Sequence, residues 1–101
     1  MPKFEWDSQK NRKNLSKHNV SFDEAKEVFN DTNSIEKLGN FRGELRVVRI
    51  GKTTTKLILM VVYTMRDVAV RLISARQANK SERNAYIENR FKKQHDENVE
   101  G

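Results

Sequence analysis

The chain has 101 residues, and its 20 Lys and Arg residues outnumber its 14 Asp and Glu residues, which gives a formal net charge of +6 at pH 7. This length is enough for one hydrophobic core and excludes two, and the absence of cysteine excludes disulfides, thiolate metal sites and cysteine nucleophiles. The longest apolar run, 57–63, is too short to cross a membrane, which takes about 20 residues.

The N-terminal segment predicts a short strand followed by a helix. Residues 4–6 alternate between apolar and polar side chains, which is the pattern of a strand. Asp7 can accept hydrogen bonds from the first turn of a helix that reaches about His18. Leu15 is the only large apolar residue of this helix, so the helix is expected to have a wide solvated face.

A second, short helix is predicted over 22–30. Ser21 and Glu24 have the spacing of a capping box, in which each side chain satisfies a free backbone N–H of the first turn. Val20, before the cap, and Ala25, after it, can form a small hydrophobic staple. The apolar residues of the segment recur at helical spacing.

Three strands joined by short turns are predicted in the second half of the chain. The segments 45–51 and 68–75 carry β-branched residues in partial alternation, and 57–65 is a continuous apolar block. A continuous apolar run is typical of a strand covered on both faces, so we expect 57–65 at the centre of the sheet. A turn at 66–67 makes the last two strands antiparallel, and the loop 51–56 does the same for the first two.

Alternation along the last of these strands places Arg76 at its end, where a sheet can present a charged group at a cleft. The strand period of two predicts that one face carries Val70, Leu72, Ser74 and Arg76. The other face is expected to carry Arg71, Ile73 and Ala75.

A final helix is predicted from a cap at Ser81 to about Lys93, with Ala85, Ile87 and Phe91 on its inward side. Residues 94–101 are acidic and poor in apolar side chains, and we expect this tail to fray. The domain is therefore expected to span 1–93.

The order of elements predicts a small single α+β domain. Its sheet is expected to be mostly antiparallel, with a meander of three to four strands plus the short N-terminal strand. Two N-terminal helices and one C-terminal helix are expected to pack with the sheet. Residues 1–14 are mostly polar and have no signal-peptide core, so we expect a cytoplasmic protein with no membrane partner.

Positive charge is concentrated in one part of the chain. Residues 46–93 contain twelve Lys and Arg against three acids, and residues 1–20 contain five against two. Residues 21–45 and the acidic tail each have three more acids than bases. A basic surface attracts anionic partners such as nucleic acid, although many small proteins are basic only for solubility.

The available side chains fit cleavage of RNA without a cofactor or metal. The four glycines lack the spacing of a phosphate-binding loop, and His18 and His95 are too far apart for a zinc site. Cutting RNA through its own 2′-OH takes a group that accepts the proton, cations that stabilise charge on the phosphate and an acid for the 5′-oxygen. Arg, Lys, Glu and one internal His supply these groups.

Each candidate residue also has a structural explanation. His18 can act as acid or base, or it can interact with the dipole at the end of its helix. Arg76 can bind phosphate or pair with a neighbouring acid. Glu44 can transfer a proton or lie solvated at a strand edge. Glu82 suits the first turn of a helix, and Tyr63, within an apolar strand, suits the core.

Four motifs then give the chain a resemblance to a known family. The first contains Phe4, Trp6, Asp7, Lys10, Asn14, Lys17, His18, Val20, Phe22, Glu24 and Ala25. The second contains Gly43, Glu44, Arg46, Ile50 and Gly51, and the third contains Val61, Val62, Tyr63, Thr64, Arg66 and Asp67. The fourth contains Ile73, Ser74, Ala75, Arg76, Ala78, Glu82, Arg83 and Tyr86. In order and spacing these motifs resemble the BrnT toxins of bacterial type II toxin–antitoxin systems.

The resemblance implies a RelE-like ribonuclease fold, a BrnA-type antitoxin in a 2:2 complex, and binding of promoter DNA only through that antitoxin. It also implies that the free toxin cleaves RNA and arrests translation and growth. On this interpretation Arg76 and Arg46 stabilise the reacting phosphate, and Glu44 and His18 are the candidate proton-transfer groups. The RNA backbone would be held by Lys10, Lys17, Arg66, Lys80 and Arg83.

Two positions depart from the family pattern. Val47 stands where many members have an aromatic residue, and Gln77 stands where many have a second arginine. The second departure keeps an alternative open, in which the chain is a basic module that binds nucleic acid and antitoxin with weak or lost nuclease activity. A third, less favoured interpretation is a structural domain whose basic surface serves only solubility.

Overall fold

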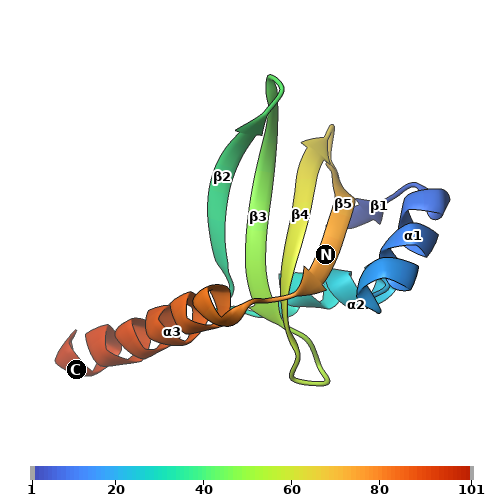
Figure 1. Ribbon diagram of the computed structural model, residues 1–101. Coiled ribbons are helices and arrows are strands. Elements are labelled where there is room, and N and C mark those ends of the chain that lie inside the picture. The colour runs from blue at the N-terminus through green and yellow to red at the C-terminus, as the bar shows by residue number, and fades with distance from the viewer. Residues whose placement is uncertain (1, 101) are drawn as a thin grey trace.

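The computed structural model describes residues 2–100, with side chains described up to Phe91. Its elements are β1 (Lys3–Glu5), α1 (Ser8–His18), α2 (Phe22–Ala25), the 3₁₀ helix η1 (Lys26–Asn30), β2 (Ile35–Phe41), β3 (Glu44–Lys52), β4 (Ile58–Arg66), β5 (Ala69–Gln77) and α3 (Lys80–Glu100). They form a single α+β domain with one five-stranded sheet of order β1-β5-β4-β3-β2 (Figure 1). The strand predicted over 57–65 is β4, and it is central as expected.

The sheet is mixed, because the short β1 pairs parallel with β5 while the other pairs are antiparallel. The β2–β3 hairpin closes with the two-residue loop Arg42–Gly43, and both residues have positive φ, 53° and 81°. That combination matches the right-handed twist of the flanking strands. The β4–β5 hairpin turns at 67–68, one residue later than predicted, with Asp67 at φ 56°.

The predicted faces of the last strand are wrong, because a β-bulge interrupts the pairing of β4 and β5 between Val62 and Tyr63. Val61 pairs with Ala75 on one side of the bulge, and Tyr63 pairs with Leu72 on the other. A bulge adds one residue to one strand, so the alternation changes phase there. Leu72 and Ala75 consequently belong to the same buried core cluster instead of lying on opposite faces.

Helix α2 and the 3₁₀ helix η1 pack against one face of the sheet and form the core with it. Ser21 caps α2 by accepting a hydrogen bond from the Glu24 backbone N–H at 3.1 Å, which is one half of the predicted capping box. The reciprocal hydrogen bond from the Ser21 N–H to the Glu24 side chain is not formed among the described residues. Val20 and Ala25 are buried, and the segment predicted as one helix over 22–30 consists of α2 followed by η1. The core cluster joins these residues to β3, β4 and β5.

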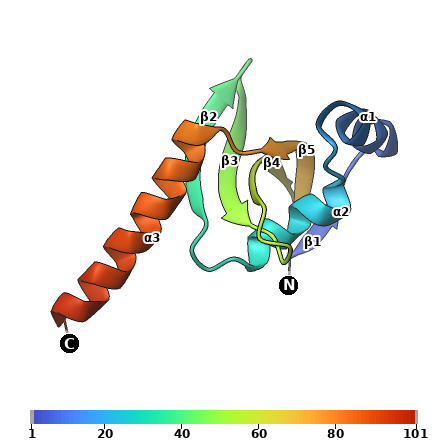
Figure 2. The same ribbon diagram turned by 60° about the horizontal axis from the view of Figure 1, so that its bottom comes forward.

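Helix α1 lies at the β5 edge of the sheet, beside the short β1 (Figures 1 and 2). Asp7 caps it by accepting hydrogen bonds from two backbone N–H groups of its first turn, at 2.8 and 3.1 Å. Asn14, the buried residue of α1, binds the backbone of Ala75 through both its oxygen and its nitrogen. This side-chain amide occupies the place of a neighbouring strand and closes part of an otherwise open edge.

Helix α3 crosses the other face of the sheet only at the lower end in Figure 1, and its C-terminal part projects away from the sheet in both views (Figures 1 and 2). Its cap is Asn79 and not Ser81, because the Asn79 side chain accepts from the Glu82 N–H and the Glu82 side chain accepts from the Asn79 N–H, both at 2.8 Å. Ser81 therefore lies within the first turn of the helix.

The predicted inward side of α3 is also wrong. Tyr86 is buried and packs with the apolar residues of the sheet, whereas Ala85, Ile87 and Phe91 are exposed. The Tyr86 hydroxyl donates a hydrogen bond to Asp31 at 2.6 Å. The helical backbone of α3 continues to Glu100, past the predicted end near residue 93. The fraying of 94–101 stays a prediction, and residue 101 lies outside the described residues. Among the described residues, no helix is both long and apolar enough to span a membrane.

A candidate nucleic-acid interface on the open sheet face

Most of the sheet face opposite α2 and η1 is left uncovered. Strand register assigns its residues, because directly paired residues lie on the same face. Apolar residues under α3, such as Ile50 and Met60, lie at one end of this face. The rest, which we call the basic face, carries Lys37, Phe41, Arg46, Thr64, Arg66, Arg71, Ser74 and Arg76.

Arg76 lies where the basic face meets the start of α3. Its Nη1 and Nη2 atoms donate to the two carboxylate oxygens of Glu82, at 2.8 and 3.0 Å, and Nη1 also donates to the backbone oxygen of Gln77. These hydrogen bonds are the main reason that the pKa of Glu82 lies below its ordinary value. Since Asn79 fixes Glu82 from the other side, the guanidinium is held in a defined orientation.

Glu44 and Arg46 form a second cluster at the β2–β3 hairpin. The Arg46 Nη2 lies 3.4 Å from the Glu44 carboxylate, and its guanidinium lies over the ring of Phe41 with 4.6 Å between the guanidinium carbon and the ring centroid. This cluster belongs to the same face as Arg76 but not to the same point on it. At about 3.3 Å per residue and about 4.8 Å per strand, the Cα atoms of Arg46 and Arg76 are about 13 Å apart along the strands and about 10 Å across them.

His18 and Lys10 are carried by α1, on the same side of the helix as Asn14. Each is four residues from Asn14, and residues four apart lie on the same side of a helix. Asn14 is hydrogen-bonded to Ala75, the residue next to Arg76. The fold thus brings this side of α1 to the same end of β5 as Arg76, although within the described residues the His18 side chain makes no hydrogen bond or ion pair.

The other predicted RNA contacts are spread over the surface. Lys17 is exposed on α1, and Arg66 is exposed at the β4–β5 turn. Arg83 donates a hydrogen bond to the backbone oxygen of Ala78 at 2.8 Å. Lys80 is exposed on the first turn of α3.

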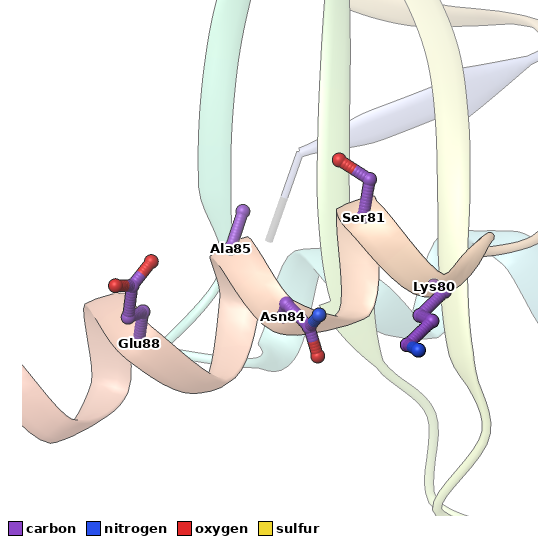
Figure 3. A pocket seen from close by; sticks show the side chains of 5 residues that line it. All are labelled: Lys80, Ser81, Asn84, Ala85 and Glu88. Carbon is purple, nitrogen blue, oxygen red and sulfur yellow. The ribbon is translucent and has the colours of Figure 1, made fainter.

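An open hollow on α3 is lined by Lys80, Ser81, Asn84, Ala85 and Glu88, and has a volume of about 560 Å³. Lys80 and Ser81 point to opposite sides of the helix there, so their polar atoms do not converge on a reacting group (Figure 3).

Sequence reasoning missed two residues of this region. Arg71 lies on the basic face with its Nη1 3.9 Å from the Glu5 carboxylate of the neighbouring strand. Simple alternation along the strand predicts that Arg71 lies on the face opposite Arg76, and the bulge is what brings both onto one face. Asn14 is a position of the first motif, but nothing in its sequence context predicts that it is buried. The one signal for a hydrogen-bonding role is a polar residue within a helix that has few apolar residues to bury.

The basic face and its borders contain more cations than acids. The cations are Lys37, Arg42, Arg46, Arg66, Arg71 and Arg76, and the acids are Glu5, Glu44, Asp67 and Glu82. Within the described part of the chain, no group of three or more His, Cys, Asp or Glu side chains is placed to hold a metal ion. The fold and this face define a small α+β domain with a cationic surface for an anionic ligand.

Comparisons with known proteins identify the family. A family model described as "Ribonuclease toxin, BrnT, of type II toxin-antitoxin system" matches residues 6–82, which is well over half of the chain. The crystal structure of the Brucella abortus ribonuclease toxin BrnT matches with a TM-score of 0.60 and 23% identity, over 79% of this chain and 100% of that one, a likeness that establishes the fold. No curated protein sequence matches the chain. The chain belongs to the BrnT family of ribonuclease toxins, and membership of a type II system implies an antitoxin partner.

Proposed function

We propose that this protein is an endoribonuclease that cleaves RNA by attack of the 2′-OH on the adjacent phosphate, and thereby arrests translation and growth. The observation that carries the proposal is Arg76, oriented by Glu82 at the end of the basic face. Charge accumulates on the phosphate oxygens only as the reaction proceeds, and a preoriented guanidinium stabilises it there. The family membership supports the same class of reaction.

The two clusters on the basic face then have different roles. Arg76 stabilises the reacting phosphate, and His18, carried to the same end of β5 by Asn14, transfers the proton. Arg46, at the far end of the face, binds a neighbouring phosphate, and Glu44 orients its guanidinium. The exposed Arg66 and the cations of α1 and α3, Lys10, Lys17, Lys80 and Arg83, contribute to holding the RNA backbone.

The proposal extends to the family's assembly. A RelE-like active face has to be covered in the resting cell, and a BrnA-type antitoxin in a 2:2 complex in the cytoplasm would cover it. Binding of promoter DNA would then occur only through the antitoxin. The excess of cations on the basic face supports an acidic partner segment, because complementary charges speed association.

Replacement of Arg76 by alanine tests the proposal. We expect Arg76→Ala to lower the rate of RNA cleavage by about 10²- to 10³-fold, the effect of removing one preorganised donor. Arg76→Lys is expected to restore little, because an ammonium lacks the planar fork of donors. Arg12→Ala removes an exposed arginine of α1 and serves as the matched control. Full cleavage by Arg76→Ala would refute the assignment of the site.

A second candidate function is a module that binds RNA and antitoxin without cleaving. It is favoured by the ion pair itself, since Glu82 already binds both terminal nitrogens of Arg76. Gln77, next to Arg76, also stands where many family members have a second arginine. Tight RNA binding by the purified chain, with no cleavage over hours, would support this alternative and contradict the nuclease.

A further inference from the structure

Phe41 is a half-exposed aromatic residue at the end of the basic face. It is the last residue of β2 and pairs directly with Glu44, so its side chain lies on the same face as Arg46. Leu38, three residues earlier, is more exposed but lies on the opposite face, because it pairs with the core residue Val47. The edge strand therefore presents an aromatic ring to the basic face and an aliphatic side chain to the other.

Two guanidinium groups lie close to the ring. The guanidinium carbon of Arg46 is 4.6 Å from the ring centroid and that of Arg42 is 5.4 Å from it. Gly39 is directly opposite Arg46 on β2 and has no side chain, so the neighbour of the Arg46 guanidinium on that strand is Phe41. The hairpin loop of two residues with positive φ fixes this arrangement at the backbone.

The hydrogen-bonding capacity of Arg46 is only partly used. Its Nε atom is buried and has no hydrogen-bond partner among the described residues, and its one ion pair, with Glu44, is long at 3.4 Å. A buried donor without a partner is unusual in a folded protein. Among the described residues, Arg42 contacts only the Phe41 ring and the Arg46 Nη1 has no acceptor, so both guanidinium groups retain donors for an acceptor that approaches the basic face.

We propose that Phe41 is a stacking subsite for a base of single-stranded RNA, with Arg42 and Arg46 binding the flanking phosphates. An exposed aromatic ring among cations is the arrangement that binds single-stranded nucleic acid, because every base has a π-face and every nucleotide has a phosphate. The inference rests on the proposed function, since it extends the RNA path from Arg76 to the hairpin tip. It assigns to Phe41 binding of the RNA chain and no part in the chemical step.

Binding of a 2′-O-methyl oligoribonucleotide, which cannot react through its 2′-oxygen, tests the subsite separately from cleavage. Stacking of one base contributes about 1–3 kcal/mol, so Phe41→Leu should raise the Kd by about 5- to 150-fold. Leu38→Ala, on the opposite face of the same strand, should change it less than about twofold. An unchanged Kd for Phe41→Leu, or an equal change for the two variants, would overturn the subsite while leaving the nuclease in place.

A tryptophan at the same position gives a direct readout of stacking. The chain has a single tryptophan, Trp6, so wild-type fluorescence sets the baseline. In Phe41→Trp the added fluorescence should be quenched by the oligonucleotide, and in Leu38→Trp it should not. Equal quenching at both positions, or loss of antitoxin binding by Phe41→Leu with RNA binding intact, would overturn the proposal. Failure of the wild-type protein to bind any single-stranded RNA would instead refute the proposed function, and the subsite with it.

Discussion

Replacement of Asn14 by alanine should destabilise the protein more than most single substitutions do. The Asn14 side chain donates to the backbone oxygens of Val20 and Ala75, at 2.8 and 2.7 Å, and accepts from the Ala75 N–H at 3.0 Å. All three bonds are buried. Alanine would remove them together and leave the backbone of Ala75 without partners at the edge of the sheet.

The magnitude follows from the number of bonds. Each hydrogen bond contributes about 1 kcal/mol, and a buried backbone group left unpaired adds a desolvation cost, so a loss of about 3–5 kcal/mol is expected. In a domain of this size 1 kcal/mol corresponds to about 4–8 °C in Tm, so even the lower figure predicts a decrease of about 12–24 °C. Asn14→Asp should be equally harmful, because a carboxylate cannot donate to the two carbonyl oxygens.

Urea and thermal denaturation followed by circular dichroism would measure the change. Asn84→Ala is the matched control, because Asn84 is exposed on α3, and its replacement should change the free energy of unfolding by less than about 0.5 kcal/mol. A loss below about 1 kcal/mol for Asn14→Ala would refute the conclusion that this amide anchors α1 to β5. Cleavage activity should fall with it, because α1 carries His18 and Lys10.

Three further predictions concern packing and ionisation. Gly51→Ala should lower the free energy of unfolding by about 1–3 kcal/mol, because the added Cβ would lie 2.9 Å from the Cβ of Val28. Gly39→Ala is the control: its nearest contact would be at 3.8 Å, so urea denaturation should show almost no change. Burial raises the pKa of both tyrosines to about 12, assisted by the hydrogen bond from Tyr63 to Glu36 and the one from Tyr86 to Asp31. Ultraviolet titration of the folded protein should therefore show no phenolate transition near pH 10, and such a transition would refute both environments. The hydrogen bond from Arg76 lowers the pKa of Glu82 in the folded protein. The wild type should therefore be more stable than Glu82→Gln above pH 4.5, the ordinary pKa, and should lose this advantage as the pH falls through the lower pKa of the folded protein. A difference in the free energy of unfolding that does not change with pH would contradict this.

Local patterns predicted the helices, the β3–β4 and β4–β5 hairpins and the central strand because these elements depend on near neighbours. Asp7 and Ser21 cap helices through N–H groups two or three residues away, and the apolar block of β4 is enough to place it at the centre. Family resemblance identified the chain correctly, since its motifs preserve spacing along most of the sequence.

Features that depend on distant contacts could not be read from periodicity. The bulge at Val62 and Tyr63 arises from the pairing of two strands, and it is what places Arg71 with Arg76. Helix α3 buries Tyr86, whose hydroxyl reaches Asp31, 55 positions earlier in the chain, while the more apolar Phe91 is exposed. The contact that brings α1 to β5 likewise joins residues 61 positions apart.

The chemistry of the cleaved ends tests the central claim most directly. Incubation of the purified protein with single-stranded RNA should give fragments with a 2′,3′-cyclic phosphate and a 5′-OH, because the 2′-oxygen attacks and the 5′-oxygen leaves. Mass spectrometry distinguishes these ends, and a 2′-deoxy substitution at the cleaved nucleotide should abolish the cut. Fragments with 3′-OH and 5′-phosphate ends, cleavage that survives the 2′-deoxy substitution, or no cleavage at all would contradict the account.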